Sequence, residues 1–357
     1  MSTTIPRALR TASLQHPRRI HSQFHVQPNT SLQTLKLSQQ SLLRYASTST
    51  TSSTSTSSTT TTTTTTTSPP PPEKPRHPIN GPLSTLPAPL DVPSQLPSEK
   101  LFPTYALRVG KAYLSFYKTG VKNIYTNFLL ARPLQDKIDK AHSFSLPAAV
   151  RAGSLTRQQF QLLTRDWHDI KRVPIFGLLF IICGEFTPLV VVALSSVVPW
   201  TCRIPTQIAA DRAKLEKRRG VSFRNLVDKL PEEKGIQTLS RPQLLHISWS
   251  LGLSSSMWDY LGGQYPGLPD FILRRKVRRT IEYIEMDDSL ILAAGGAKDT
   301  KVPNDLIKEM DTEEVRMALV ERGVDIQGRD EKILREHLMA WLKSRESAPV
   351  ERLLLTR

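Results

Sequence analysis

The sequence predicts an all-α protein with a single transmembrane helix and a disordered amino-terminal region. Residues 173–200 form an almost uninterrupted apolar run, which is typical of a membrane span. On both sides of this run, apolar residues recur at the spacing of a helix. Residues 1–100 are rich in Ser, Thr and Pro and do not supply a folded domain. The chain has 357 residues and a formal net charge of +16 at pH 7.

Residues 1–46 have the composition of a mitochondrial transit peptide. The first 72 residues contain no Asp or Glu and are rich in Arg and Ser, as transit peptides are. The sequence Arg44-Tyr45-Ala46-Ser47 resembles a matrix-protease cleavage site, with the arginine two residues before the cut. A disordered basic tail is the alternative interpretation.

Residues 47–100 are predicted to be a disordered linker. A Ser/Thr tract runs to four consecutive prolines at 69–72, and such a composition cannot bury apolar surface. An O-glycosylated stalk has a similar composition, but the transit peptide argues against secretion. The only cysteines, Cys183 and Cys202, lie within and beside the apolar run, so we expect neither a disulfide framework nor a Cys-based zinc site.

Residues 101–172 are predicted to form amphipathic helices before the membrane. Apolar and aromatic residues follow helical spacing from Val109 to Phe128, and Arg and Lys hold much of the remaining face. Such a helix can lie on an anionic membrane surface or dock on its own domain, and the sequence leaves both open. A second helix is expected over residues 155–170, with Thr156 as its N-cap.

Residues 173–200 are long enough to cross a bilayer, because about twenty apolar residues at ~1.5 Å each span a hydrocarbon core of ~30 Å. A buried helix of a soluble domain is the alternative. The one charged residue in the run is Glu185, and Pro188 is expected to kink the helix beside it. Glu185 and Pro188 are therefore a candidate proton or cation site, or alternatively a packed acid near a bend.

Basic residues flank the apolar run on both sides. They favour the anionic, non-translocated face of a membrane, although charge alone decides the orientation weakly. The flanking residues are Lys171, Arg172, Arg203, Arg212, Lys214, Lys217, Arg218 and Arg219.

Residues 201–346 are predicted to form a helical domain, followed by a tail at 347–357. Ser240 is a suitable N-cap for a helix through Leu251, and Thr312 begins a segment with the chemistry of a helix start. Further helices are expected at 271–284, 304–309, 312–322 and 330–344. The last of these are also similar to the SAP module of chromatin proteins, which would predict DNA binding but would not explain a membrane span.

The helix at 271–284 carries a dense basic cluster. These side chains could contact RNA phosphates, or they could form a solvated or lipid-facing surface. The candidate residues are Arg274, Arg275, Lys276, Arg278 and Arg279.

Several motifs, in their order along the chain, resemble the leucine zipper–EF-hand-containing transmembrane (LETM) family. They include Arg165-Asp166, the acid and proline within the apolar run, Asp287-Asp288, Arg322-Gly323 and Trp341-Leu342. The resemblance implies a mitochondrial inner-membrane protein with a 14-3-3-like, matrix-facing ribosome-binding domain. The chain departs from the family because it has neither an EF-hand calcium loop nor a long coiled coil.

Two functions follow from this resemblance. The first is a non-enzymatic protein that binds the mitochondrial ribosome and supports membrane-protein biogenesis and ion homeostasis. The alternative is a component of K⁺/H⁺ exchange that uses Glu185. Inner-membrane lipid, a second copy of the chain or other inner-membrane proteins are expected as further partners. The sequence has no P-loop, dinucleotide fingerprint or convincing metal cluster, so we expect no enzyme activity, cofactor or metal.

Overall fold

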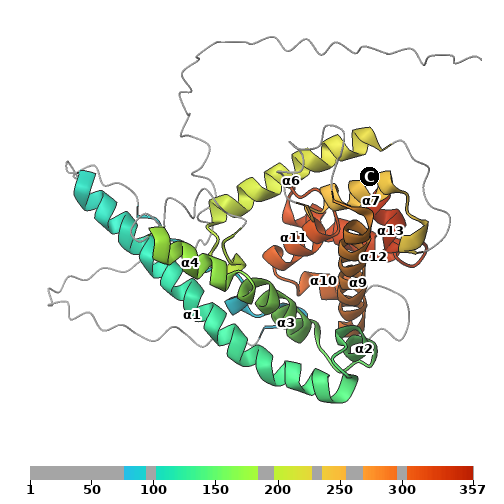
Figure 1. The fold of residues 1–357 in the computed structure, drawn as a ribbon, viewed down its shortest axis with the longest axis horizontal. Coiled ribbons are helices and arrows are strands. Elements are labelled where there is room, and N and C mark those ends of the chain that lie inside the picture. The colour runs from blue at the N-terminus through green and yellow to red at the C-terminus, as the bar shows by residue number, and fades with distance from the viewer. Residues whose placement is uncertain are drawn as a thin grey trace, which may run out of the picture. The chain divides into compact units, whose positions relative to one another are not determined.

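The computed structural model describes residues 76–93, 102–183, 197–226, 235–254, 268–295 and 304–356. The regular elements of these ranges are helices, which confirms the predicted all-α class (Figure 1). The α-helices are α1 (Phe102–His142), α2 (Leu146–Arg151), α3 (Arg157–Ile170), α4 (Val173–Cys183), α6 (Pro205–Asn225), α7 (Arg241–Ser250), α9 (Asp270–Ala294), α10 (Asn304–Lys308), α11 (Thr312–Glu321), α12 (Glu331–Ser344) and α13 (Val350–Leu355). Short 3-10 turns are η2 (Leu83–Thr85), η4 (Trp200–Cys202) and η5 (Ile236–Thr238).

The main hydrophobic core lies between the helices of the carboxyl half. Helix α9 packs against α7 and α13, and α11 packs against α12. Ile247, Ile284, Leu319 and Leu338 are fully buried in this core. The strict apolar spacing along α9 and α12 allows each helix to bury one face, as the sequence predicts.

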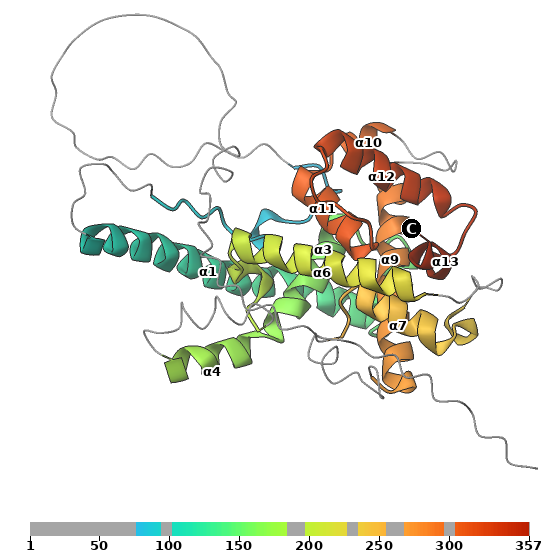
Figure 2. The ribbon, with the colours of Figure 1, turned by 90° about the horizontal axis from the view of Figure 1, so that it is seen from above.

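A second core joins the amino-terminal helices to α9. Ala131 and Ile138 of α1 pack with Phe160 of α3 and with Leu290 of α9. The Phe160 ring also stacks on Tyr283 of α9, with 5.4 Å between the ring centroids. Helices from before and after the apolar run therefore share one packed interior (Figure 2).

The predicted starts of three helices are confirmed. Thr156 and Ser240 each accept a hydrogen bond from the backbone three residues later, and a Gln at that position bonds back to form a capping box. Helix α11 begins at Thr312, but its N-cap is Asp311. Glu314, in the first turn of α11, is buried and contributes to a charge network instead of facing solvent.

Residues 76–93 lie within the predicted linker but are packed against the helical domain. Ile79 is fully buried, and the side chain of Asn80 bonds the Glu309 carbonyl and the Asp311 amide, each at 2.8 Å. The predicted disordered linker therefore does not extend through this segment. Composition missed it because the segment is held by single polar side chains and by its backbone, and not by an apolar stripe.

Candidate membrane-contacting site

Helix α4, the first part of the apolar run, is apolar on every side. Phe176 and Leu179 pack toward Ile124 of α1. The opposite side exposes Ile175, Leu178, Ile181 and Ile182, and the last two are 79% and 73% exposed. A continuous exposed apolar surface of this kind marks a contact with lipid or protein. Figure 2 shows α4 projecting on the side of the molecule away from α10 and α12.

The two ends of the apolar run are held together by one carboxylate. Asp169, at the end of α3, is buried and accepts a hydrogen bond from the Trp200 amide at 2.7 Å. It also accepts bonds from the Thr201 amide at 3.2 Å and the Thr201 hydroxyl at 3.1 Å. We call Asp169, Trp200 and Thr201 the clasp. Because the acceptor is a buried carboxylate and the bonds are charge-assisted, the clasp holds the end of the run next to the residues that precede its start.

Helix α1 supports the clasp through a close approach at Gly120. A Cβ atom at this position would lie 2.7 Å from the sulfur of Cys202 and 3.0 Å from the Thr201 carbonyl oxygen. Both distances are too short for ordinary contacts. Gly120 therefore allows η4 to pack directly on α1, next to Ile124 and Val198.

Each end of the apolar run carries an aromatic ring paired with a cation. The Lys171 ammonium lies 4.2 Å from the centre of the Trp167 ring, and the Arg203 guanidinium lies 5.4 Å from the Trp200 ring. Trp167 is 61% exposed. Trp with Lys or Arg is the combination found where proteins meet the headgroup region of a bilayer.

Further cations gather around these pairs. Burial lowers the pKa of Lys171, and the neighbouring cations Arg279 and Arg172 lower it further. The pKa of Arg172 is also lowered, first by burial and then by Arg203. Arg279 belongs to α9, so the basic face of α9 adjoins the base of α4. This site would attract an anionic surface.

Helix α1 docks on its own domain, which is one of the two alternatives that the sequence left open, and its contact with a membrane stays a prediction. Its carboxyl-terminal part docks on α2 and α3. Its amino-terminal part exposes Leu107, Leu114, Val121 and Tyr125, which recur at helical spacing along one side. This end of α1 extends beyond the packed helices in Figure 1.

A buried charge network fixes α3, and with it α4, to the rest of the domain. Arg157 donates to Asp287 of α9 at 2.8 Å and to Glu314 of α11 at 3.2 Å. Arg165 contacts Glu314 through two bonds, at 2.7 and 2.9 Å. Arg322 closes the network with a bond of 2.7 Å to Asp287.

The network keeps its carboxylates ionised despite their burial. Burial alone would raise the pKa of Asp287, but Arg157 and Arg322 outweigh it and hold that pKa well below its ordinary value. Arg165 likewise outweighs burial and lowers the pKa of Glu314. Glu321, at the edge of the network, differs because burial and the charge of Asp287 raise its pKa to about 7.

The predicted proton or cation site lies outside the described residues. Glu185 and Pro188 fall between α4 and Val197, so the structure neither places them nor brings them together with other groups. No helix within the described ranges is both long and apolar enough to cross a membrane. The described first part of the predicted span, α4, has 11 residues.

The basic residues after the apolar run mostly serve the domain itself. Arg212 pairs with Glu313 of α11 at 2.5 Å, and Arg218 donates to the Ser254 carbonyl at 3.2 Å. Arg219 is buried and donates to the Ser250 carbonyl at 3.1 Å. Lys214 and Lys217 are exposed on α6.

The basic cluster of α9 divides into two groups. Arg274 donates to the Ile236 and Leu239 carbonyls at 2.8 and 3.2 Å, and Lys276 donates to the Leu253 carbonyl at 3.0 Å. These two cations hold the domain together. The exposed members of the cluster are Arg275, Arg278 and Arg279.

Sequence reasoning misses the clasp and the charge network. It singles out Arg165, Asp287 and Arg322 only as parts of family motifs, and it gives Asp169 no role of its own. The sequence does contain an indication of the network, because Asp287 and Glu314 occupy helix positions in line with buried apolar residues and Arg322 directly follows α11. The sequence does not show which of these charges pair, because partners such as Arg157 and Asp287 are 130 residues apart.

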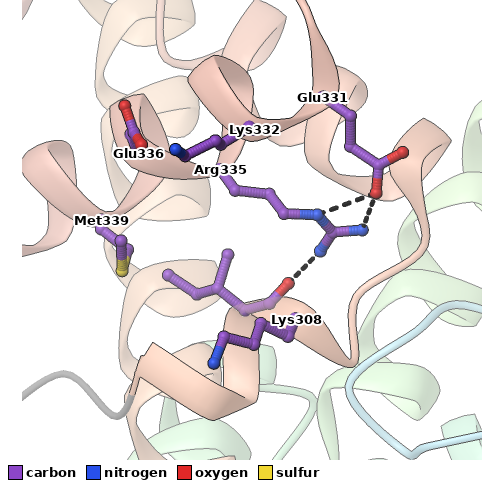
Figure 3. A pocket seen from close by; sticks show the side chains of 7 residues that line it. Lys308, Glu331, Lys332, Arg335, Glu336 and Met339 are labelled. Carbon is purple, nitrogen blue, oxygen red and sulfur yellow. Dashed lines mark hydrogen bonds and ion pairs between the residues drawn. The ribbon is translucent and has the colours of Figure 1, made fainter.

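Among the described residues, neither a cofactor pocket nor a group of metal ligands is evident. A depression of about 450 Å³ lies between α10 and α12, but its central Arg335 is engaged by Glu331 and by the Ile307 carbonyl (Figure 3). Within the described ranges, no three His, Cys, Asp or Glu side chains are grouped as metal ligands would be.

The family model of the pentamidine resistance factor domain matches residues 100–294. This range contains α1 to α9, and so includes α4, the clasp and the basic face of α9. No curated protein sequence and no solved structure gave a significant match.

This match corrects the sequence-based identification. The predicted LETM membership is wrong, because the family model that matches is a different one. The ribosome-binding function and the alternative of K⁺/H⁺ exchange are contradicted with that membership. The 14-3-3-like domain is implied only by the LETM resemblance. The mitochondrial location agrees with the family. Since the match covers more than half of the chain, this mitochondrial protein belongs to the pentamidine resistance factor domain family.

Proposed function

We propose that this chain is a non-enzymatic protein of the mitochondrial inner membrane, anchored to the lipid by residues 173–200. The observation that carries the proposal is the exposed apolar surface of α4, with a Trp–cation pair at each end of the run. Burying such a surface in hydrocarbon is favourable by about 25 cal/mol for each Å² of apolar area. The Trp and cation side chains then suit the headgroup region.

The proposal assigns the helical domain to the matrix face. The acid-free amino terminus supports import into the matrix. Lys214 and Lys217 of α6, exposed soon after the run, suit the anionic and non-translocated face. A structural role is supported over a catalytic one because the buried charges of Arg157, Asp287 and Arg322 satisfy one another.

The proposed partner is inner-membrane lipid. The exposed apolar side of α1, including Leu107 and Leu114, could also take a second copy of the chain or another membrane protein. In either case the domain would be held at the membrane surface and present its remaining faces to the matrix.

A substitution pair on α4 tests the anchor. Leu178 and Ile182 are exposed one helical turn apart, so Leu178→Glu with Ile182→Glu places two charges on the lipid-contacting side. Each charge near the bilayer centre costs about 2.5–3.5 kcal/mol or more. We expect wild-type chain to resist carbonate extraction of mitochondria and the double variant to be released.

The control is Ile333→Glu, which introduces one such charge at an exposed apolar position of α12. It should remain in the membrane pellet. If the α4 double variant is imported and still resists carbonate as well as wild type, α4 is not the anchor.

A further inference from the structure

We propose that the apolar run begins and ends at the same face of the membrane, so that Val173 and Trp200 lie at one surface and the run is re-entrant instead of crossing the bilayer. The inference rests on the proposed membrane anchoring. It replaces the expected single-pass arrangement, in which the chain on the two sides of the run would lie on opposite sides of the bilayer.

The first argument comes from the clasp. Twenty-eight residues in a continuous helix would separate the ends of the run by about 42 Å at ~1.5 Å per residue. Asp169, four residues before Val173, instead bonds the Trp200 amide at 2.7 Å. Trp200, at the end of the run, therefore lies beside the residues that precede its start.

The second argument is independent of α4 and comes from the charge network. Arg157 and Arg165 precede the apolar run, whereas Asp287 and Glu314 follow it. Their contacts, at 2.8 Å for Arg157 with Asp287 and 2.7 Å for Arg165 with Glu314, are buried in the domain interior. Groups on opposite sides of a bilayer cannot touch in this way. The segments before and after the run must share one aqueous compartment.

The hydrophobic packing leads to the same result. Phe160 of α3 stacks on Tyr283 of α9, and Leu290 of α9 packs among residues of α1 and α2. A bilayer with a hydrocarbon core of ~30 Å could not separate these helices without dismantling this core.

The length of α4 fits a segment that reaches into one leaflet. Its 11 residues extend about 16 Å at ~1.5 Å per residue, which is roughly half of the hydrocarbon thickness. Both Trp–cation pairs lie next to the clasp, at the base of α4. Trp167 with Lys171 and Trp200 with Arg203 can therefore meet the headgroups of the same leaflet.

Single-cysteine labelling tests the inference in the full chain. Cys183 and Cys202 are replaced by Ala, and one cysteine is introduced either at Arg151, before the run, or at Lys217, after it. Both positions are exposed. A membrane-impermeant maleimide is added to mitoplasts before and after the inner membrane is permeabilised. We expect both cysteines to be protected at first and both to react after permeabilisation.

The unmodified chain gives a second readout that does not depend on the substitutions. Protease is added to mitoplasts, and fragments are detected with antibodies to residues 102–142 and to residues 331–355. We expect both epitopes to be protected together. Protection of one flank with exposure of the other, by label or by protease, would overturn the re-entrant arrangement.

Two other outcomes separate this inference from the function on which it rests. Reaction of both cysteines in intact mitoplasts supports the shared face but contradicts the assignment to the matrix. Release of wild-type chain by carbonate contradicts the membrane anchor itself, and with it the re-entrant segment.

Discussion

Asp287 joins the part of the chain before the apolar run to the part after it. It accepts hydrogen bonds from Arg157 and Gln161 of α3, each at 2.8 Å, and from Arg322 at 2.7 Å. A buried carboxylate is favourable only when such partners offset its desolvation. Here the two guanidinium groups offset it, and they in turn depend on Asp287 for their own compensation.

Replacing Asp287 should therefore destabilise the whole domain. Asp287→Ala leaves Arg157 and Arg322 buried with less opposing charge, and breaking a buried pair in this way costs about 3–5 kcal/mol. We expect a large drop in the thermal unfolding midpoint of the detergent-solubilised protein. The control is Glu331→Gln, which removes a pair with Arg335 on the surface and should cost no more than about 1 kcal/mol. Equal effects of the two substitutions would contradict a stabilising network.

Glu321 gives the domain a pH dependence near neutrality. The pKa of Glu321 is about 7 in the folded protein, and its ordinary value is 4.5. Between these two pH values the folded state therefore holds a proton that the unfolded state has released. The contribution of Glu321 is therefore most favourable below pH 4.5 and is lost as the pH rises through 7. Asp166, with a pKa raised to about 6 by burial and by Asp169, acts in the same direction.

Glu321→Gln should remove most of this dependence. Gln keeps an acceptor for the Tyr283 hydroxyl, which bonds Glu321 at 3.1 Å, but it carries no charge to bury. We expect the variant to be more stable than wild type at pH 8, on the order of 1–3 kcal/mol, and nearly equal at pH 5. Unfolding midpoints at several pH values measure this. A variant with the same pH slope as wild type would show that Glu321 does not titrate in this range.

At the scale of elements, much of the helical content could be predicted. The caps at Thr156 and Ser240 are visible in the sequence because a local side-chain bond depends only on residues three positions apart. The start of α11 is located too, but the burial of Glu314 is not, because its partner Arg165 is 149 residues away. The packing of residues 76–93 depends on similarly distant partners.

Gly120 offers a test of how α1 supports the clasp. Ala is normally more stable than Gly inside a helix by about 0.5–1 kcal/mol. At Gly120 the added Cβ would lie 2.7 Å from the Cys202 sulfur, so Gly120→Ala should destabilise the protein by about 1–3 kcal/mol. At Gly110, on the same helix, an added Cβ would meet no atom within 4 Å. Gly110→Ala should therefore be neutral or stabilising.

Unfolding midpoints of the two glycine variants are compared in the same detergent. Opposite signs are the expected result, because the substitution is chemically identical and only the contact differs. A stabilising effect at both positions would show that η4 does not approach α1 as closely as the structure indicates.

At the scale of the molecule, the topology proposed above rests on contacts that composition does not show. The apolar run and its flanking cations are visible in the sequence, and by themselves they predict a single span. What composition cannot show is that Asp169 and Trp200 meet, or that α3 and α9 share a core. Topology depends on these long-range contacts. The same limit applies to the basic cluster of α9, where Arg274 and Lys276 are engaged by backbone carbonyls.

The exposed part of that cluster should bind anionic lipid. Arg275, Arg278 and Arg279 are exposed on α9, and Arg279 lies close enough to Lys171, just before α4, to lower its pKa. Each cation near an anionic surface contributes about 1 kcal/mol. Replacing all three by Ala should weaken binding of the purified protein to vesicles with anionic lipid by about ten- to a hundredfold, and should leave its weaker binding to neutral vesicles unchanged.

The control replaces two exposed cations, Lys332 and Lys343, on α12, which lies on the other side of the molecule from α4 in Figure 2. If the membrane contacts the base of α4, these substitutions should change anionic-vesicle binding little. Raising the salt concentration should also reduce wild-type binding more than that of the α9 variant, because screening removes an attraction that the variant has already lost. Equal losses for the α9 and α12 variants would indicate a non-specific effect of net charge and would remove the α9 face from the membrane-contacting site.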